Sequence, residues 1–278
     1  MLRICVAGAT GWVGRAVAEA IPQTPDLRLA VGVARRSAGS DLGLALGRGE
    51  IGVPVMGTVD EALRGVAVDV VIDYTSHLAV KQNALVALGH GVPVVIGSSG
   101  LSAAEFDEID AVARTSGVGV IASGNFSITA AMAQAAALLV AAHLPNVEII
   151  DYAYAEKLDA PSGTSRELAE RIVTRWETDR TTQPEMAPAD SAIDVPSTRG
   201  ARVAGIPIHS VRLPSYSVST EVVFGLPDER LTIRHDAGQS AAPYVGGTLL
   251  AARMVVGRVG LTRGLDALLF EGVSDRAR

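Results

Sequence analysis

The sequence predicts an α/β protein with an N-terminal parallel sheet and a C-terminal α+β part that contains a mixed or antiparallel sheet. In the first half, short runs of β-branched residues alternate with helical stretches, which is typical of a parallel sheet covered on both faces. In the second half, strand-like segments follow one another with turns between them, which favours antiparallel pairing. With 278 residues, 48% of them hydrophobic and 4% aromatic, the chain can fill two cores with aliphatic side chains.

The first half is expected to alternate strands and helices from its first residues. Strands are predicted at residues 3–7, 27–34, 68–73, 93–96 and 118–122. A helix is predicted over Trp12–Ile21, because Pro22 cannot continue it. Ser102 and Glu105 have the spacing of a capping box and predict the start of the helix that precedes the last of these strands.

The second half predicts more strands than helices. Strands are expected at residues 146–156, 206–213, 217–224 and 230–235, and helices at 165–176 and 243–256. The segment Thr178–Arg199 is rich in Thr, Pro, Asp and Ser, which predicts a long loop. We therefore expect one domain over residues 1–127 and a second over 128–239, with the C-terminal segment from about 240 to 278 free to pack back on the first.

The composition argues against several kinds of partner. A net charge of −6 does not fit a nucleic-acid-binding protein. Cys5 is the only cysteine, so no intramolecular disulfide can form, and the five histidines lack metal-ligand spacing. The most apolar helical stretch, Ile128–Leu144, contains polar residues and predicts a buried helix rather than a membrane span. Because no targeting signal is found at the N-terminus, we expect a cytoplasmic protein. The cysteine and histidine pattern predicts no bound metal.

Three glycines follow the first predicted strand and open the first predicted helix. Gly8, Gly11 and Gly14 give the spacing G-x-x-G-x-x-G, one residue looser than the standard dinucleotide-binding pattern. The first glycine permits a tight turn, the second lets a pyrophosphate approach the backbone, and the third lets the helix pack on the strand. The alternative is a plain turn. In this context we expect a cofactor site that also includes Thr10, Trp12 and Val13.

The end of the second predicted strand indicates which dinucleotide binds. Sites that prefer NAD place a carboxylate there for the ribose 2′-hydroxyl, but this chain has Arg35 and Arg36. Guanidinium groups suit a 2′-phosphate. We therefore expect NADPH, with NADH possible, and the alternative is a solvated basic loop.

Polar and aromatic residues also follow other predicted strands. The carboxyl ends of parallel strands meet at one edge of a sheet, where such folds bind ligands. Each segment alone could be an ordinary turn, but their convergence favours a cofactor site. The residues concerned are Tyr74, Gly97, Ser98, Ser99, Asn125 and Phe126.

A loop in the second half combines a lysine with small polar residues. Ser162, Gly163 and Thr164 precede a predicted helix and can bind a carboxylate, although a simple helix cap is the alternative. Only two of the 24 basic residues are lysines, and one of them, Lys157, stands just before this loop. A lysine can donate a proton where an arginine practically cannot. The alternative is a generic surface lysine. Three arginines, Arg199, Arg212 and Arg234, could also hold a carboxylate, but each is more often a surface ion-pair partner.

The order of these motifs resembles that of the dihydrodipicolinate reductase family over nearly the whole chain. The segments that carry the resemblance are residues 8–14, 71–75, 95–100, 125–127, 157–164 and 208–212, of which Lys-x-Asp-Ala-Pro-Ser-Gly-Thr is the most specific. The resemblance implies an N-terminal Rossmann domain and a C-terminal α/β domain that binds substrate and forms a homotetramer. It also implies reduction of a cyclic unsaturated dicarboxylate with NADH or NADPH, in lysine and diaminopimelate synthesis. The family's lysine falls on Lys157, and its carboxylate loop falls on Ser162, Gly163 and Thr164.

The chain departs from the family pattern at its histidines. Ala153 and Tyr154 stand where the family has a His-His pair, and Ser219 stands where it has a later histidine. The glycine loop has Trp12-Val13 in place of the usual Arg-Met. Tyr154 could supply a hydroxyl for catalysis, and a packing role is the alternative. These departures predict weak or no activity on the family's substrate and a preference for a smaller or less charged imine or enone.

We therefore expect an NADPH-dependent reductase that transfers hydride to a C=N or conjugated C=C bond of a small, carboxylate-bearing substrate, as a homotetramer or homodimer. The alternatives are an imine reductase or reductive aminase of a secondary pathway and a non-catalytic NADP-binding sensor, which would not need the Lys157 loop. Semialdehyde dehydrogenases share a similar glycine loop but need a catalytic cysteine far along the chain. Short-chain dehydrogenases need Tyr-x-x-x-Lys, and the residues four before the two lysines are His77 and Ala153.

Overall fold

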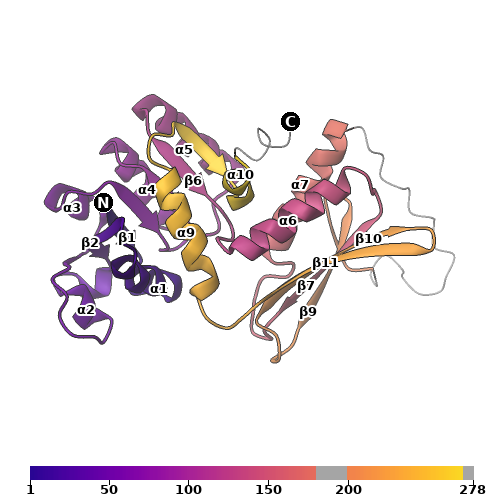
Figure 1. The fold of residues 1–278 in the computed structure, drawn as a ribbon, viewed down its shortest axis with the longest axis horizontal. Coiled ribbons are helices and arrows are strands. Elements are labelled where there is room, and N and C mark those ends of the chain that lie inside the picture. Colours follow the sequence, from indigo (N-terminus) through magenta and orange to yellow (C-terminus); the bar gives the residue numbers. More distant parts are fainter. Residues whose placement is uncertain (180–198, 272–278) are drawn as a thin grey trace. The chain divides into compact units, whose positions relative to one another are not determined.

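A computed structural model describes residues 1–179 and 199–271, and Figure 1 shows its course. The chain divides into two compact units. Unit 1 comprises Met1–Ile128 together with the described residues from Ala241 onward, and unit 2 comprises the described part of Thr129–Ser240. The α/β fold class expected from the sequence is confirmed, with a parallel sheet in one unit and a mixed sheet in the other.

Unit 1 is built on a seven-stranded sheet of order β12-β6-β5-β4-β1-β2-β3, in which every pair of neighbours is parallel. The strands are β1 (Leu2–Ala7), β2 (Leu27–Val33), β3 (Val55–Met56), β4 (Val70–Asp73), β5 (Val94–Ile96), β6 (Gly119–Ala122) and β12 (Gly260–Arg263). The short edge strands β3 and β12 were not predicted, because their sequences are too short to show a period.

Helices cover both faces of this sheet, as the continuous apolar strands require. They are α1 (Trp12–Ala20), α2 (Leu42–Ala45), α3 (Val59–Gly65), α4 (Val80–Gly89), α5 (Ala103–Ser116), α9 (Ala242–Met254) and α10 (Leu265–Leu269). Residues of α3, α4 and α5 share a core with Cys5 and Ala7 of β1, so these helices lie on one face. The predicted capping box of α5 is present, with the Ser102 and Glu105 side chains each bound to the other's backbone N–H.

The described residues of unit 2 form a five-stranded sheet of order β11-β10-β7-β9-β8 and two helices. The elements are α6 (Ile128–Ala141), β7 (Val147–Ala153), α7 (Gly163–Asp179), β8 (Ala201–Val203), β9 (Ile206–Arg212), β10 (Val218–Leu226) and β11 (Glu229–Ala237). β7 and β9 pair in parallel and the other neighbours pair antiparallel, so the sheet is mixed. α7 extends to Asp179, past its predicted end, and residues 180–198 of the predicted loop lie outside the described part of the chain.

One face of the unit 2 sheet packs on helices α6 and α7. Along β7, buried residues alternate with partly exposed ones, and Ile149 lies in a core with Leu168 and Ile172 of α7. The Trp176 indole N–H of α7 donates to the Ala141 carbonyl of α6 at 2.8 Å, which ties the two helices together. The core of unit 2 therefore lies on this face of the sheet.

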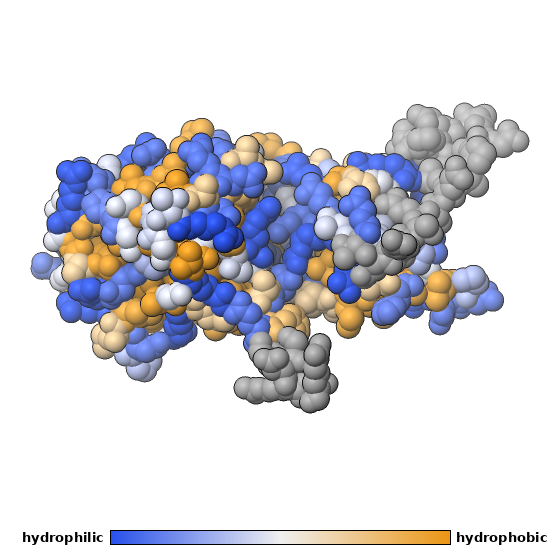
Figure 2. Space-filling model, turned by 90° about the horizontal axis from the view of Figure 1, so that it is seen from above, coloured by the Kyte–Doolittle hydropathy of each residue, from blue (hydrophilic) through white to orange (hydrophobic). Residues whose placement is uncertain are grey.

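The surface of the molecule is mixed in character. On the face drawn in Figure 2, hydrophilic residues cover most of the surface and hydrophobic residues appear in smaller groups among them. Within residues 1–179 and 199–271, no helix combines the length and apolar character needed to cross a bilayer.

Candidate active site

The glycines after β1 stand where side chains do not fit. Gly8 has a φ of +79°, and a Cβ there would lie 2.4 Å from the Tyr74 carbonyl oxygen. A Cβ on Gly14 would lie 2.1 Å from the Gly8 carbonyl oxygen. Glycine at position 8 therefore permits the turn, and glycine at position 14 permits α1 to approach the end of β1.

The N-terminus of α1 is open to an anion. Its N-cap, Gly11, provides no capping side chain, and its first turn carries no acidic residue. Thr10, Gly11 and Trp12 are exposed there, and Val13 is half-buried. The unpaired N–H groups and the positive end of the helix dipole suit a pyrophosphate. Trp12 lies edge-to-face against Tyr244, with ring centroids 5.8 Å apart, so an aromatic surface borders this helix end.

Arg35 and Arg36 lie in a short 3₁₀ helix, η2 (Arg35–Ser37), directly after β2. Both side chains are exposed, and neither forms an ion pair with another described residue. Asp41, the first acidic residue after them, accepts hydrogen bonds from the backbone N–H groups of residues 43, 44, 51 and 53. Its carboxylate is committed to its own loop. Both guanidinium groups therefore remain available to an external anion.

A buried carboxylate joins the loops that follow β4 and β5. Asp73 is fully buried, and its Oδ1 accepts from the backbone N–H and hydroxyl of Thr75 at 2.9 and 2.7 Å and from the Ser98 hydroxyl at 2.9 Å. Its Oδ2 accepts from the Asn83 side chain at 2.8 Å. Asp73 therefore orients both loops at this edge of the sheet. No role for Asp73 is predicted from the sequence, although a carboxylate at the end of an apolar strand is a usable signal.

The Tyr74 ring is enclosed by its neighbours. A Cβ on Gly97 would lie 2.2 Å from the Tyr74 ring, so glycine is needed there to make room for it. The Thr248 hydroxyl donates to the Tyr244 carbonyl, so the Tyr74 hydroxyl donates to Thr248 Oγ1, at 2.6 Å. Burial raises the pKa of Tyr74, which keeps this hydroxyl protonated. Phe126 is buried against the same ring, at 6.3 Å between centroids.

The predicted strand ends meet at one edge of the sheet. β1, β4, β5 and β6 are neighbours and parallel, so Gly8, Tyr74, Gly97 and Asn125 follow strands that end on the same side. Asn125 is held in a turn, with its Oδ1 accepting from the Ser127 N–H at 2.8 Å. An open pocket of about 280 Å³ lies at this edge, lined by residues 74–77 and 97–99, which include Ser98 and the exposed Ser99.

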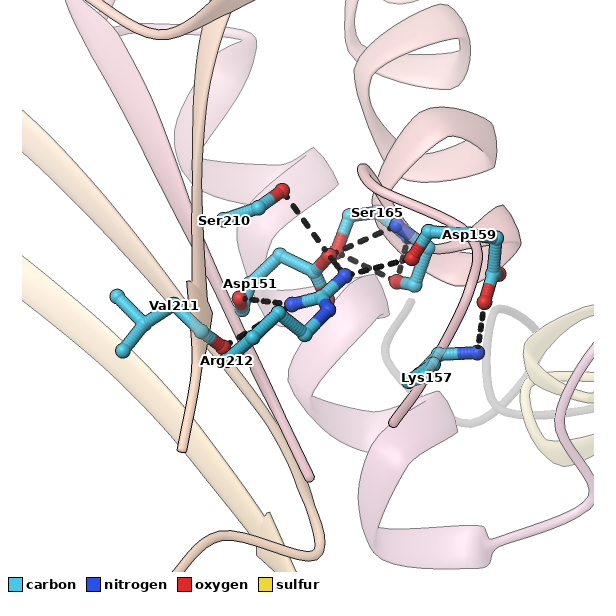
Figure 3. A network of polar contacts seen from close by, with 8 residues as sticks. Asp151, Lys157, Asp159, Ser165, Ser210, Val211 and Arg212 are labelled. Atoms are coloured by element: carbon cyan, nitrogen blue, oxygen red, sulfur yellow. Dashed lines mark hydrogen bonds and ion pairs between the residues drawn. The ribbon is translucent and has the colours of Figure 1, made fainter. Parts of the chain in front are cut away.

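In unit 2, Lys157 lies on the loop between β7 and α7. Its ammonium Nζ donates to Asp159 Oδ1 at 2.5 Å, as Figure 3 shows. Burial acts to raise the pKa of Asp159, but the Lys157 ammonium and backbone N–H groups, among them that of Gly163, outweigh it and hold this pKa below its usual value. Lys157 therefore has a carboxylate partner from its own loop, close to the N-terminus of α7.

The three small residues of the loop differ in their surroundings. Ser162 is buried, its backbone N–H donates to Asp151 Oδ2 at 2.7 Å, and its hydroxyl bonds to Ser165 of α7. Gly163 is exposed and Thr164 is half-buried. Gly163 and Thr164 are therefore accessible to a carboxylate, whereas Ser162 is engaged with the protein interior.

An ion pair beneath this loop was missed as a site feature. Asp151 of β7 is fully buried and accepts from Arg212 Nη2 of β9 at 2.7 Å. Arg212, for which the sequence leaves open a carboxylate-binding role or a surface ion pair, forms this ion pair, and its side chain is only 15% exposed. Asp151 occupies an inward-facing place in the alternating burial of β7, which its sequence does not reveal because Ile149 and Ile150 are both apolar.

The positions at which the family's histidines are absent are spread over two strands. Ala153 is fully buried at the end of β7, and the next residue, Tyr154, is 43% exposed with its backbone N–H bound to the Ser217 carbonyl. Ser219 is buried on β10, and its side chain hydrogen-bonds to Asp236 of β11. Tyr154 is therefore the only one of the three whose side chain reaches solvent.

His209 and His235 on the strands are each hydrogen-bonded to another side chain, and Cys5 is buried. His209 Nε2 lies 2.8 Å from Glu148, and His235 Nε2 lies 3.0 Å from the Thr129 hydroxyl. Cys5 is buried in the core. In the described part of the chain, no three His, Cys, Asp or Glu side chains come together as a metal site would require.

A glycine turn and an uncapped helix N-terminus at the edge of a parallel sheet are typical of dinucleotide-binding enzymes. The chain belongs to the dihydrodipicolinate reductase family, since the model of the family's N-terminal part matches residues 2–126 and that of its C-terminal part matches residues 125–269. Members of this family are NAD(P)H-dependent oxidoreductases. The resemblance recognised in the sequence is confirmed.

Similar proteins span nearly the whole chain. A 4-hydroxy-tetrahydrodipicolinate reductase of Thermosynechococcus vestitus is 36% identical over 276 residues, which cover 96% of this chain and 97% of the relative. The enzyme of the same name from Moorella thermoacetica is 34% identical, and the match covers 96% of this chain and 98% of that relative. The solved structure of a dipicolinate-bound dihydrodipicolinate reductase from Paenisporosarcina sp. TG-14 matches with a TM-score of 0.81 at 27% identity. The match covers 96% of this chain and 99% of that protein. An amine dehydrogenase from Mycobacterium smegmatis, at 16% identity and a TM-score of 0.64, shares the fold.

Proposed function

We propose that this protein is an NADPH-dependent reductase that transfers hydride to a C=N or conjugated C=C bond of a small, carboxylate-bearing substrate. The observation that carries the proposal is the loop between β7 and α7, where Lys157 lies beside a helix N-terminus with Gly163 and Thr164 accessible. A cation and the N–H groups of a helix N-terminus at one place are the donors that a carboxylate needs, and the Asp159 carboxylate already accepts from both Lys157 and Gly163. A dinucleotide-binding sensor without catalysis would have no use for this loop.

The residues of unit 1 fit the cofactor. Close backbone approach at Gly8 and Gly14, with the uncapped N-terminus of α1, suits the pyrophosphate. Arg35 and Arg36 would bind the 2′-phosphate, which supports NADPH over NADH. The loops held by Asp73 would support the nicotinamide end. When bound, the reduced nicotinamide supplies the hydride, and the protein orients it.

Lys157 would donate the proton that accompanies hydride transfer or hold the substrate carboxylate. The group that would do either is its ammonium Nζ, which donates to Asp159 Oδ1 at 2.5 Å. Gly163 and Thr164 would bind the carboxylate through the helix N-terminus. Tyr154, with its exposed side chain, would offer a hydroxyl to the substrate in place of a histidine.

The curated relatives are named for 4-hydroxy-tetrahydrodipicolinate, which makes that compound of lysine and diaminopimelate synthesis the second candidate substrate. We favour a smaller or less charged imine or enone, because Ala153 and Ser219 offer no imidazole. Each missing donor leaves a substrate oxygen less well paired, at a cost of about 1–3 kcal/mol. Loss of two such donors would lower activity on the dicarboxylate by about two orders of magnitude or more.

The test measures the rate of NADPH oxidation with different substrates and with variants of the two lysines. Oxidation of NADPH is followed with enzymatically generated 4-hydroxy-tetrahydrodipicolinate and with cyclic imines that bear one carboxylate. Lys157→Ala should lower kcat by about a hundredfold or more on the better substrate. Lys81→Ala is the matched control, because the other lysine is paired with Glu108 on the surface of unit 1 and should change nothing.

Each result has a clear meaning. Efficient turnover of the dicarboxylate, at kcat/KM of about 10⁴ M⁻¹s⁻¹ or more, would refute the altered substrate and establish the relatives' activity. Binding of NADPH without turnover of any of these compounds would favour the sensor. An unchanged rate for Lys157→Ala would remove this lysine from the mechanism.

We also propose that the protein acts in the cytoplasm as a homotetramer or homodimer, with no nucleic-acid or membrane partner. The face of the unit 2 sheet opposite α6 and α7 carries Ile150, Tyr152 and Val211, which are only partly buried by the described residues. A partly apolar sheet face favours a second copy of the chain. Light scattering would measure the mass, and a monomer at micromolar concentration would refute the assembly.

A further inference from the structure

Asp151 and Arg212 form an ion pair on neighbouring parallel strands, beneath the loop that carries Lys157. Asp151 is fully buried and the Arg212 side chain is 15% exposed. Arg212 Nη2 lies 2.7 Å from Asp151 Oδ2, and its Nη1 donates to the Asp151 carbonyl at 2.8 Å. The pair thus joins the ends of β7 and β9 where the loop leaves the sheet (Figure 3).

Each partner also holds one side of the loop. Asp151 Oδ2 accepts from the Ser162 backbone N–H at 2.7 Å. Arg212 Nη2 donates to the Asp159 carbonyl at 2.7 Å. These two contacts bracket the Ala160-Pro161 step and end on the same guanidinium–carboxylate pair. Figure 3 shows Arg212 between Asp151 and Asp159.

The two bracketed residues lead directly to the groups that would bind the substrate anion. The Asp159 side chain holds the Lys157 ammonium, and Ser162 precedes Gly163 and Thr164 at the start of α7. Fixing the Asp159 carbonyl and the Ser162 N–H therefore fixes the spacing between the ammonium and the helix N-terminus. A carboxylate that needs both at once depends on that spacing.

The hydrogen bonding of the pair is incomplete. Asp151 Oδ1 and Arg212 Nε are buried without a hydrogen-bond partner among the described residues. Buried charges lose their hydration, and replacing such a pair with apolar side chains of similar size is often neutral or stabilising. Stability of the fold is therefore a weak reason for the pair, and the shape of the loop is a stronger one.

We propose that Asp151 and Arg212 are positioning residues that set the distance between Lys157 and the N-terminus of α7 and thereby determine substrate carboxylate affinity. Neither contacts the substrate. The proposal rests on the carboxylate site described under the proposed function. Because the cofactor residues belong to unit 1, loss of the pair should change substrate affinity and leave cofactor affinity unchanged.

The experiment replaces both charges together, because a single replacement would strand a buried charge and endanger folding. In the full-length Asp151→Leu/Arg212→Met variant, the melting temperature and the NADPH Kd should match those of wild type, while the substrate KM should rise at least about tenfold with a smaller fall in kcat. Arg212→Lys keeps the charge but loses the two-pronged contact, so its substrate KM should lie between those of wild type and the double variant. Arg253→Met is the matched control, since it removes a guanidinium from another Arg–Asp pair, with Asp26 in unit 1.

A binding measurement without turnover separates this proposal from the proposed function. The Kd of dipicolinate and of pyridine-2-carboxylate, in the presence of NADP⁺, is measured by calorimetry for each variant. The positioning role is supported if the double variant binds these compounds at least about tenfold more weakly than wild type, while the control variant has the same Kd as wild type. Equal binding by the double variant and wild type overturns it while leaving the site intact. If wild type binds neither compound, the carboxylate site itself is wrong, and the positioning role falls with it.

Discussion

The choice of cofactor is expected to depend on Arg35 and Arg36. Both guanidinium groups are exposed beyond β2 and have no ion-pair partner among the described residues, so no internal contact must break before they bind a phosphate. A hydrogen bond to a charged group contributes about 1.5–3 kcal/mol. Because these side chains are exposed, the lower value applies to each, and the pair should contribute about 3 kcal/mol. Replacing both with alanine should therefore weaken NADPH binding by about a hundredfold, and replacing one by about tenfold.

Calorimetric titration of NADPH and NADH into wild type, Arg35→Ala/Arg36→Ala and Arg28→Ala measures this directly. Wild type should prefer NADPH, the double variant should bind the two cofactors alike, and NADH affinity should stay constant throughout. Arg28 is an exposed arginine of β2 itself and controls for loss of charge. Added salt should reduce the preference in wild type, since exposed charges are screened. Equal affinity of wild type for NADPH and NADH would refute the reasoning.

Three further outcomes are expected. Gly14→Ala would place a methyl group 2.1 Å from the Gly8 carbonyl oxygen and should abolish NADPH binding in calorimetry, whereas Gly89→Ala, at a helical position with open space, should bind it normally. Burial raises the pKa of the Cys5 thiol to about 12, so between about pH 9 and 12 the folded protein keeps a proton that the unfolded chain has lost, and the free energy of unfolding should fall with rising pH by up to about 1.4 kcal/mol per unit. In urea titrations at several pH values, Cys5→Ala should show a smaller dependence of the free energy of unfolding on pH than wild type, and an equal dependence would contradict the role of Cys5. Tyr154→Phe should lower kcat by about a hundredfold if its hydroxyl donates a proton, while Tyr216→Phe should not, and equal rates for both would leave Tyr154 a packing role.

Much of unit 1 could be predicted because its signals are local. The runs that form β1, β2, β4, β5 and β6 are mostly apolar and rich in β-branched residues, and a strand buried on both faces needs no partner's sequence to be recognised. The capping box of α5 lies within four residues of chain. The edge strands β3 and β12 lack such signals. They are strands because a neighbour offers them hydrogen bonds, and that neighbour is distant in sequence.

The candidate site divides in the same way. The glycine spacing at Gly8 and Gly14 and the order of residues around Lys157 predict a cofactor site and an anion site, because turns, helix ends and donor groups are properties of short segments. The partners of these residues depend on strands that pair across the chain. Asp151 meets Arg212 only because β7 and β9 lie side by side in parallel, since the two residues are 61 positions apart in the sequence.

Residue patterns alone were enough to establish the fold class and the family, and they predict a cofactor site at one edge of the parallel sheet and an anion-binding loop around Lys157. Only the tertiary structure decided that Ser162 faces the interior while Gly163 and Thr164 remain accessible, and that Asp159 binds the Lys157 ammonium. It alone placed a buried ion pair beneath that loop. The physical reason is that a pattern of residue types sets which backbone conformations are favourable, whereas burial and hydrogen-bond partners depend on which distant segments pack together.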